Sequence, residues 1–233
     1  MSTGPVSARF NDQATGLVIF DCDGVLVDSE LISAQVLMET LSGEGLAVDE
    51  KFVFERFLGR SMASAQDVLL EQFSYHLEDR LKDEISARVR QRMAGELEAV
   101  PGVSAALAAI KSPKCVASSS APERLRFSLG KTRLLKFFGR RIFSATMVAK
   151  GKPAPDLFLY AAKEMRTAPE QCVVIEDSPA GVEAAKRAKM RVFAFTGGAH
   201  AARSGLKSAL AALDPDAIFD NMSELPGLLA QGR

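Results

Sequence analysis

Short apolar runs recur along the chain, and helical stretches separate them. The first run is Leu17 to Phe20, and a similar run lies at Cys172 to Ile175. A short continuous apolar run bounded by polar residues is typical of a strand buried on both faces. The runs predict strands at about 17–21, 114–120, 141–144, 172–175, 191–195 and 217–219. Strands that alternate with helices predict an α/β fold with a doubly wound parallel sheet.

One long segment departs from this alternation. From residue 30 to residue 98 the apolar residues follow helical spacing, for example at Leu81, Ile85, Val89 and Met93. A helical segment of this length is too long for an ordinary crossover between neighbouring strands. It predicts an inserted all-helical cap domain at 30–98, with residues 1–29 and 99–233 forming the catalytic core.

Composition and charge narrow the class of protein. The chain has 233 residues, 47% of them hydrophobic, and its 29 Lys+Arg balance its 29 Asp+Glu. This balance argues against a broadly basic nucleic-acid binder. The N-terminus lacks the apolar core of a signal peptide, and no stretch of apolar residues is long enough to span a membrane. Three widely spaced cysteines, Cys22, Cys115 and Cys172, indicate buried free thiols in a reducing compartment. We therefore expect a cytoplasmic protein, and a monomer because cap and core can bury each other's apolar faces.

Two carboxylates follow the first predicted strand. Asp21 and Asp23 lie two positions apart, so on an extended strand both side chains point to the same side. Two ionised carboxylates at the end of a buried strand are costly unless a cation or a proton accompanies them. A metal-assisted site is one interpretation, and an Asp/Gly-rich turn before Gly24 is the other. This pattern alone does not decide between them.

Polar residues also end the other predicted strands. Ser118 and Ser119 lie at the end of the second strand, Lys152 precedes a helix, and Glu176 and Asp177 follow a later strand. Because the carboxyl ends of parallel strands share one edge of a sheet, these side chains are expected to converge on the two aspartates. The carboxylates then call for a divalent cation, and oxygen ligands favour Mg²⁺.

This set of side chains suits phosphoryl transfer. Lys152 and the metal would neutralise phosphate oxygens, and Ser118 would donate a hydrogen bond to one of them. Asp21 could attack phosphorus to give an aspartyl-phosphate. Asp23 could protonate the leaving alcohol and then deprotonate the attacking water.

Taken together, four segments resemble the motifs of the haloacid dehalogenase superfamily. They are Asp21 to Val25, Ser118, Lys152 to Asp156, and Glu176 to Gly181. The resemblance covers essentially the whole chain and is strongest to the helical-cap subfamily, which includes β-phosphoglucomutase and many sugar-phosphate phosphatases.

The resemblance implies a role for each matching residue. Asp21 would be the nucleophile and a Mg²⁺ ligand, and Asp23 the acid/base, with its main-chain carbonyl on the metal. Ser118, Ser119 and Lys152 would hold the phosphoryl group, while Glu176 and Asp177 would complete the metal site. The implied substrates are small phosphorylated metabolites, namely sugar, sugar-acid or polyol phosphates such as 6-phosphogluconate.

Three departures favour a hydrolase over the alternative, a β-phosphoglucomutase-type isomerase. Ser33 and Ala121 stand where the mutases have His and Lys, and Met62 stands where they have Arg. Arg60 in the cap loop is the candidate for substrate contact, although a solvated surface arginine has the same appearance in a sequence.

Other interpretations stay open. His200 is expected on a surface loop, with a position at the rim of the pocket as the alternative, and Asp28 or Ser29 is expected to cap the helix that begins near Glu30. A receiver-type signalling module shares Asp, Mg²⁺, Ser and Lys but would lack the cap. An inactive family member that binds a partner is the remaining alternative.

Overall fold

The computed structural model describes residues 15–57, 62–201 and 205–231. In these ranges six parallel strands form one sheet in the order β3-β2-β1-β4-β5-β6. The strands are β1 (Leu17–Phe20), β2 (Lys114–Ser118), β3 (Ile142–Ser144), β4 (Cys172–Glu176), β5 (Arg191–Phe195) and β6 (Ala217–Phe219). The predicted strands are therefore all present, with bounds that differ by a residue or two.

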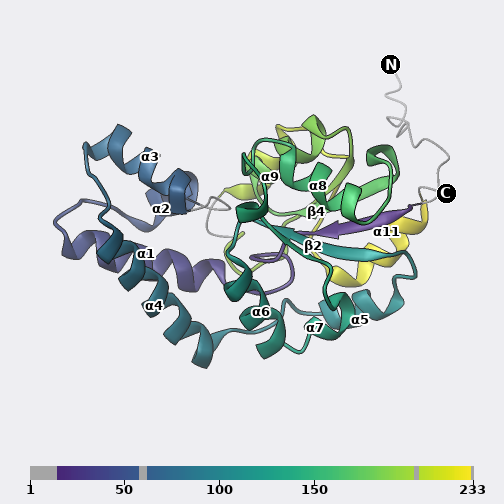
Figure 1. Ribbon diagram of the computed structural model, residues 1–233, viewed down its shortest axis with the longest axis horizontal. Helices are drawn as coiled ribbons and strands as arrows, with labels where there is room; N and C mark the ends of the chain where they lie inside the picture. The colour runs from purple at the N-terminus through teal and green to yellow at the C-terminus, as the bar shows by residue number, and fades with distance from the viewer. Residues whose placement is uncertain (1–14, 58–61, 202–204, 232–233) are drawn as a thin grey trace, which may run out of the picture.

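Helices cover both faces of the sheet (Figure 1). One face packs against α5 (Val103–Ala109), α6 (Pro122–Lys131), α7 (Leu135–Phe138) and α11 (Leu225–Gln231). The other packs against α8 (Asp156–Glu164), α9 (Pro179–Arg187) and α10 (Leu206–Ala211). In β1, Val18 and Phe20 face the first layer while Leu17 and Ile19 face the second, as the alternation of a strand requires. This confirms the α/β, doubly wound class and explains why the strands read as continuous apolar runs.

Four helices lie together to one side of the sheet (Figure 1). They are α1 (Glu30–Gly43), α2 (Glu50–Phe57), α3 (Met62–Phe73) and α4 (Asp79–Glu96), called the four-helix block below. The apolar spacing on α4 is confirmed, because Leu81, Ile85, Val89 and Met93 are all buried. The division into core and cap domain at residues 30 and 98 stays a prediction.

The chain enters and leaves the four-helix block through two segments that lie side by side. Val27 forms an antiparallel bridge with Ala99. The Asp28 N–H donates to the Glu98 carbonyl at 3.1 Å, and the Val100 N–H donates to the Leu26 carbonyl at 3.0 Å. These main-chain hydrogen bonds tie the first linker to the second directly beside the loop after β1.

The three cysteines are buried and carry no disulfide, as their spacing indicates. None of the helices in the described ranges combines the length and the apolar character that crossing a bilayer requires.

Candidate active site

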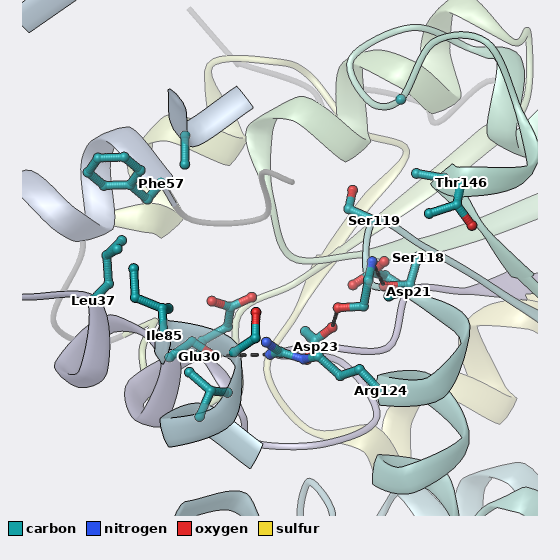
Figure 2. A pocket seen from close by; sticks show the side chains of 18 of the residues that line it. Asp21, Asp23, Glu30, Leu37, Phe57, Ile85, Ser118, Ser119, Arg124 and Thr146 are labelled. Carbon is teal, nitrogen blue, oxygen red and sulfur yellow. Dashed lines mark hydrogen bonds and ion pairs between the residues drawn. The ribbon is translucent and has the colours of Figure 1, made fainter. Parts of the chain in front are cut away.

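The candidate site lies at the carboxyl ends of β1, β2 and β4. The chain proceeds from β1 to β2 on one side and later returns to β4 on the other, so the strand order reverses at β1. Open α/β sheets bind ligands at such a point. Asp21 follows β1 directly, and its N–H donates to the Ile175 carbonyl at 2.9 Å. A cavity of about 540 Å³ opens there between the sheet edge and the four-helix block (Figure 2).

Lys152 joins the carboxylates of two strands. Its Nζ lies 2.6 Å from Oδ1 of Asp21 and 2.5 Å from Oε1 of Glu176, and the side chain is 1% exposed. Burial disfavours a charged amine, but the two carboxylates raise the pKa of Lys152 above its ordinary value. The ammonium therefore stays charged beside the residue proposed as the nucleophile.

Glu176 is held at both oxygens. Its Oε2 accepts from the N–H groups of Asp177 and Ser178 at 2.9 Å each and from the Ser178 hydroxyl at 3.0 Å. A Cβ at Gly181 would lie 1.9 Å from this carboxyl group, so the start of α9 packs directly on it. In this arrangement Glu176 positions Lys152. The role of Glu176 in the metal site stays a prediction.

The carboxyl groups of Asp21 and Asp177 are buried together. Burial raises the pKa of Asp21 well above its ordinary value, and Glu176, Asp177 and Asp23 add to the effect while Lys152 opposes it. Burial, and then Glu176, likewise raise the pKa of Asp177. One ammonium does not balance the charges of these carboxylates, and a further cation beside them would lower the pKa values of Asp21 and Asp177.

The donor set fits a magnesium ion. Oδ2 of Asp177 is buried and accepts no hydrogen bond from the described residues, although Nε2 of His200 approaches it to 3.0 Å outside hydrogen-bond geometry. A Cβ at Gly24 would lie 1.8 Å from this oxygen. No three Asp, Glu, His or Cys side chains in the described ranges already form a complete cage. Mg²⁺ needs no such cage, because it keeps several waters and uses one or two carboxylates. Asp21, Asp177 and the main-chain carbonyl of Asp23 are the groups that would hold it.

Asp23 makes a different set of contacts. Its Oδ1 accepts from Ser29 Oγ at 2.5 Å and from the Arg124 guanidinium at 2.8 Å, and its Oδ2 accepts from Ser120 Oγ at 2.6 Å. Burial alone would raise the pKa of Asp23, but Arg124 and the two hydroxyls together lower it. The pKa values of the two aspartates of the motif are therefore shifted in opposite directions.

Two of these partners were missed in the sequence, and one was misread. Arg124 on α6 and Ser120 were not assigned to the site. Ser29 does precede α1, but its side chain makes no capping hydrogen bond and instead contacts Asp23. The Asp28 carboxylate accepts from the Ala199 N–H at 3.0 Å rather than capping α1.

The structure also gives the positions of Ser118, Ser119 and His200, which the sequence singled out. Ser118 is 1% exposed and lines the cavity beside Ser119, next to Asp21 (Figure 2). Arg60 lies outside the described residues. The expectation that His200 is a surface residue is wrong, since it is 1% exposed and packs against Asp177 and Gly24. The pair Gly197-Gly198 before it was the available signal, because a Cβ at Gly198 would lie 2.7 Å from the His200 ring.

Comparison with known proteins assigns the class. Residues 15–189 match the family described as haloacid dehalogenase-like hydrolase. This match covers most of the chain, and the protein therefore belongs to that family of hydrolases. It is a phosphatase of the family.

Particular relatives share most of their length with this chain. The 6-phosphogluconate phosphatase of Escherichia coli is 34% identical over 78% of this chain and 83% of its own length. The phosphorylated carbohydrates phosphatase of Thermotoga maritima is 30% identical over 89% of this chain and 98% of its own. A solved haloacid dehalogenase-like protein of Agrobacterium tumefaciens superposes with a TM-score of 0.81 at 33% identity, covering 94% of this chain and 99% of its own.

Proposed function

We propose that the protein is a Mg²⁺-dependent phosphatase that hydrolyses small phosphorylated carbohydrates, among them sugar, sugar-acid or polyol phosphates, through an aspartyl-phosphate. The observation that carries the proposal is the meeting of Asp21, Asp23, Ser118, Lys152 and Asp177 at one edge of the sheet. Together these side chains provide a nucleophile, an acid/base and donors for phosphate oxygens.

In the first half-reaction Asp21 attacks phosphorus and the bond from phosphorus to the leaving oxygen breaks. Lys152 and Ser118 donate hydrogen bonds to the phosphoryl oxygens, which gain charge in the transition state. Asp23 gives a proton to the leaving alkoxide. A bound Mg²⁺ would supply positive charge that offsets the phosphate and keeps the Asp21 carboxylate ionised.

In the second half-reaction the Asp23 carboxylate takes a proton from water, and the water oxygen attacks phosphorus and releases Asp21. The contacts with Arg124, Ser120 and Ser29 favour the ionised Asp23 that this step requires. The first step needs Asp23 protonated, which requires a weaker contact with Arg124 than the 2.8 Å seen here. Both steps therefore depend on how tightly Arg124 holds Asp23.

The relatives support the carbohydrate class. One is a 6-phosphogluconate phosphatase and another a phosphorylated carbohydrates phosphatase, and both align with most of this chain. The predictions of a cytoplasmic protein and of a monomer are kept as part of the proposal.

The test is phosphate release from acetyl phosphate, p-nitrophenyl phosphate and a panel of carbohydrate phosphates, with Mg²⁺ or with EDTA. Wild type should release phosphate only with the metal, and Asp21→Asn should be inactive. The panel includes β-glucose 1-phosphate with glucose 1,6-bisphosphate, because isomerisation without phosphate release would favour the mutase. Equal inactivity of wild type and Asp21→Asn on every compound would refute the proposal.

A further inference from the structure

His200 is a buried side chain beside the site that the proposed reaction does not use. It lies in the loop after β5 and is 1% exposed. Its Nε2 lies 3.0 Å from Oδ2 of Asp177, which is equally shielded from water. Burying an imidazole costs free energy unless its nitrogen atoms find partners, so a histidine at this position needs a reason beyond filling space.

The main chain on both sides confines the imidazole ring next to Asp177. A Cβ at Gly24 would overlap Oδ2 of Asp177 and would lie 2.8 Å from Cε1 of His200, so both side chains pack on the same stretch of main chain. On the opposite side a Cβ at Gly198 would lie 2.7 Å from the same ring carbon. The fold therefore holds the ring beside the carboxyl group and leaves it little room to move away.

The loop that carries the ring is also tied to the segment after β1. The Ala199 N–H donates to the Asp28 carboxylate at 3.0 Å, one residue before His200. This hydrogen bond joins the loop after β5 to the chain that enters α1. The position of the ring is thus fixed by contacts outside the carboxylate cluster itself.

Asp177 can bind the imidazole and a cation together. A carboxylate oxygen has two lone pairs, so Oδ2 can accept an N–H from His200 and still bind a metal ion. The negative charge of the carboxylate favours the imidazole tautomer with its proton on Nε2. The distance of 3.0 Å already suits a hydrogen bond, and rotation of the Asp177 carboxyl group would align it.

We propose that His200 is a positioning residue for the metal site, whose Nε2–H holds Oδ2 of Asp177 so that the carboxylate is oriented before Mg²⁺ binds. This inference rests on the proposed Mg²⁺-dependent phosphatase activity and adds a residue that lies outside the four motif segments. A partner that orients a ligand in this way typically contributes about tenfold to a hundredfold to metal affinity.

The test measures Mn²⁺ binding to the full chain without substrate, by electron paramagnetic resonance of the free ion. Mn²⁺ shares with Mg²⁺ the preference for octahedral oxygen ligands. His200→Leu removes the donor and should weaken binding about tenfold to a hundredfold. His200→Gln places an amide N–H near the position of Nε2 and should bind within about threefold of wild type.

Two further variants complete the comparison. His200→Asn places its amide N–H nearer the position of Nδ1, away from Asp177, and should bind as weakly as His200→Leu. The pair of Gln and Asn variants decides the question even where His200→Leu fails to fold, which circular dichroism in EDTA would show. His76→Leu, at the exposed histidine before α4, is the matched control and should bind like wild type.

Acetyl phosphate hydrolysis supplies the second arm. His200→Leu should need about tenfold to a hundredfold more Mg²⁺ for its half-maximal rate. Its kcat at saturating Mg²⁺ should stay within about threefold of wild type, because the cavity lining does not include His200.

The outcomes separate the two proposals. Unchanged Mn²⁺ affinity in His200→Leu and His200→Asn would overturn this inference, and so would equal losses in the Gln and Leu variants. A lower kcat with an unchanged Mg²⁺ requirement would also overturn it. Failure of wild type to bind Mn²⁺ or to hydrolyse any phosphate would instead refute the proposed function.

Discussion

Replacing Glu30 by Gln should remove the loss of stability that this residue causes as the pH rises. The pKa of Glu30 is raised from 4.5 to about 8, mainly by burial and then by Asp23 and Asp177. The folded state therefore holds this proton more tightly than the unfolded state does. The stabilisation is complete below about pH 4.5 and is lost as the pH rises through about 8. The Gln variant has no such proton to lose.

The size of the effect follows from the two pKa values. They lie roughly 3.5 apart, and at about 1.4 kcal/mol for each pKa unit the full effect is bounded at roughly 5 kcal/mol. Glu30 lines a cavity and is partly exposed, so water screens part of the penalty. We expect the Gln variant to gain about 1–3 kcal/mol relative to wild type between pH 5 and pH 9.

Urea unfolding without added metal, followed by circular dichroism at pH 5, 7 and 9, measures this difference. Glu164→Gln, at an exposed position near the end of α8, is the control for loss of a carboxylate far from the site. A difference between wild type and Glu30→Gln that stays constant within about 0.5 kcal/mol over this range would refute the argument, because Glu30 would then titrate alike in both states.

Three further changes test the site. Lys152→Met leaves the buried carboxylates of Asp21 and Glu176 without their ammonium, and urea unfolding at pH 7 should show a loss of about 3–5 kcal/mol. The loss should be smaller at pH 5, where the carboxylates can take up protons, and equal losses at both pH values would contradict the argument. Gly24→Ala forces a Cβ onto Asp177 at a residue with φ of 78° and should cost about 2–4 kcal/mol; calorimetry showing an unchanged melting temperature would count against the packing described. Arg124→Met should lower kcat about tenfold to a hundredfold with KM nearly unchanged, and it should shift the pH profile of kcat, because Arg124 lowers the pKa of Asp23. Arg124→Lys keeps the positive charge and should retain most of the activity. An unshifted pH profile in Arg124→Met would exclude this positioning role.

The sheet edge was predictable because its chemistry depends on topology. Once the apolar runs are taken as parallel strands, Asp21, Ser118 and Asp177 must meet, whatever the loops between them do. The structure also brings Lys152 to this edge, where it contacts Asp21 and Glu176. The roles assigned to these residues stay predictions.

The surroundings of Asp23 were not predictable in this way. Arg124 and Arg126 are both cations on α6, and a sequence does not say which one faces the site. The phase of the helix decides it, since Leu125 and Leu129 are buried and turn Arg124 toward Asp23 while Arg126 is exposed. Such pairings depend on the rotation of a helix by a fraction of a turn, which hydrophobic spacing fixes only roughly.

The same limit explains His200. A lone histidine in a glycine-rich loop has no periodic pattern to assign it a side. Its burial follows from the close packing of its ring on Gly24 and Gly198. The Gly197-Gly198 pair signals a close approach in the sequence, but it does not say which side chain fills the space. The prediction on Arg60 lies outside the described residues.

The place of β1 in the sheet has a consequence for the order of folding. Residues 17–20 pair with residues 114–116 on one side and with residues 172–175 on the other. During synthesis this apolar segment therefore leaves the ribosome long before either neighbour exists, whereas α1 to α4 contact mainly one another and can form early. Non-local pairing of this kind slows folding, because the loop must close before any contact compensates its entropy. Asp21, the proposed nucleophile, gains its surroundings only after β4 docks, so catalytic competence should be among the last properties that the chain acquires as it folds.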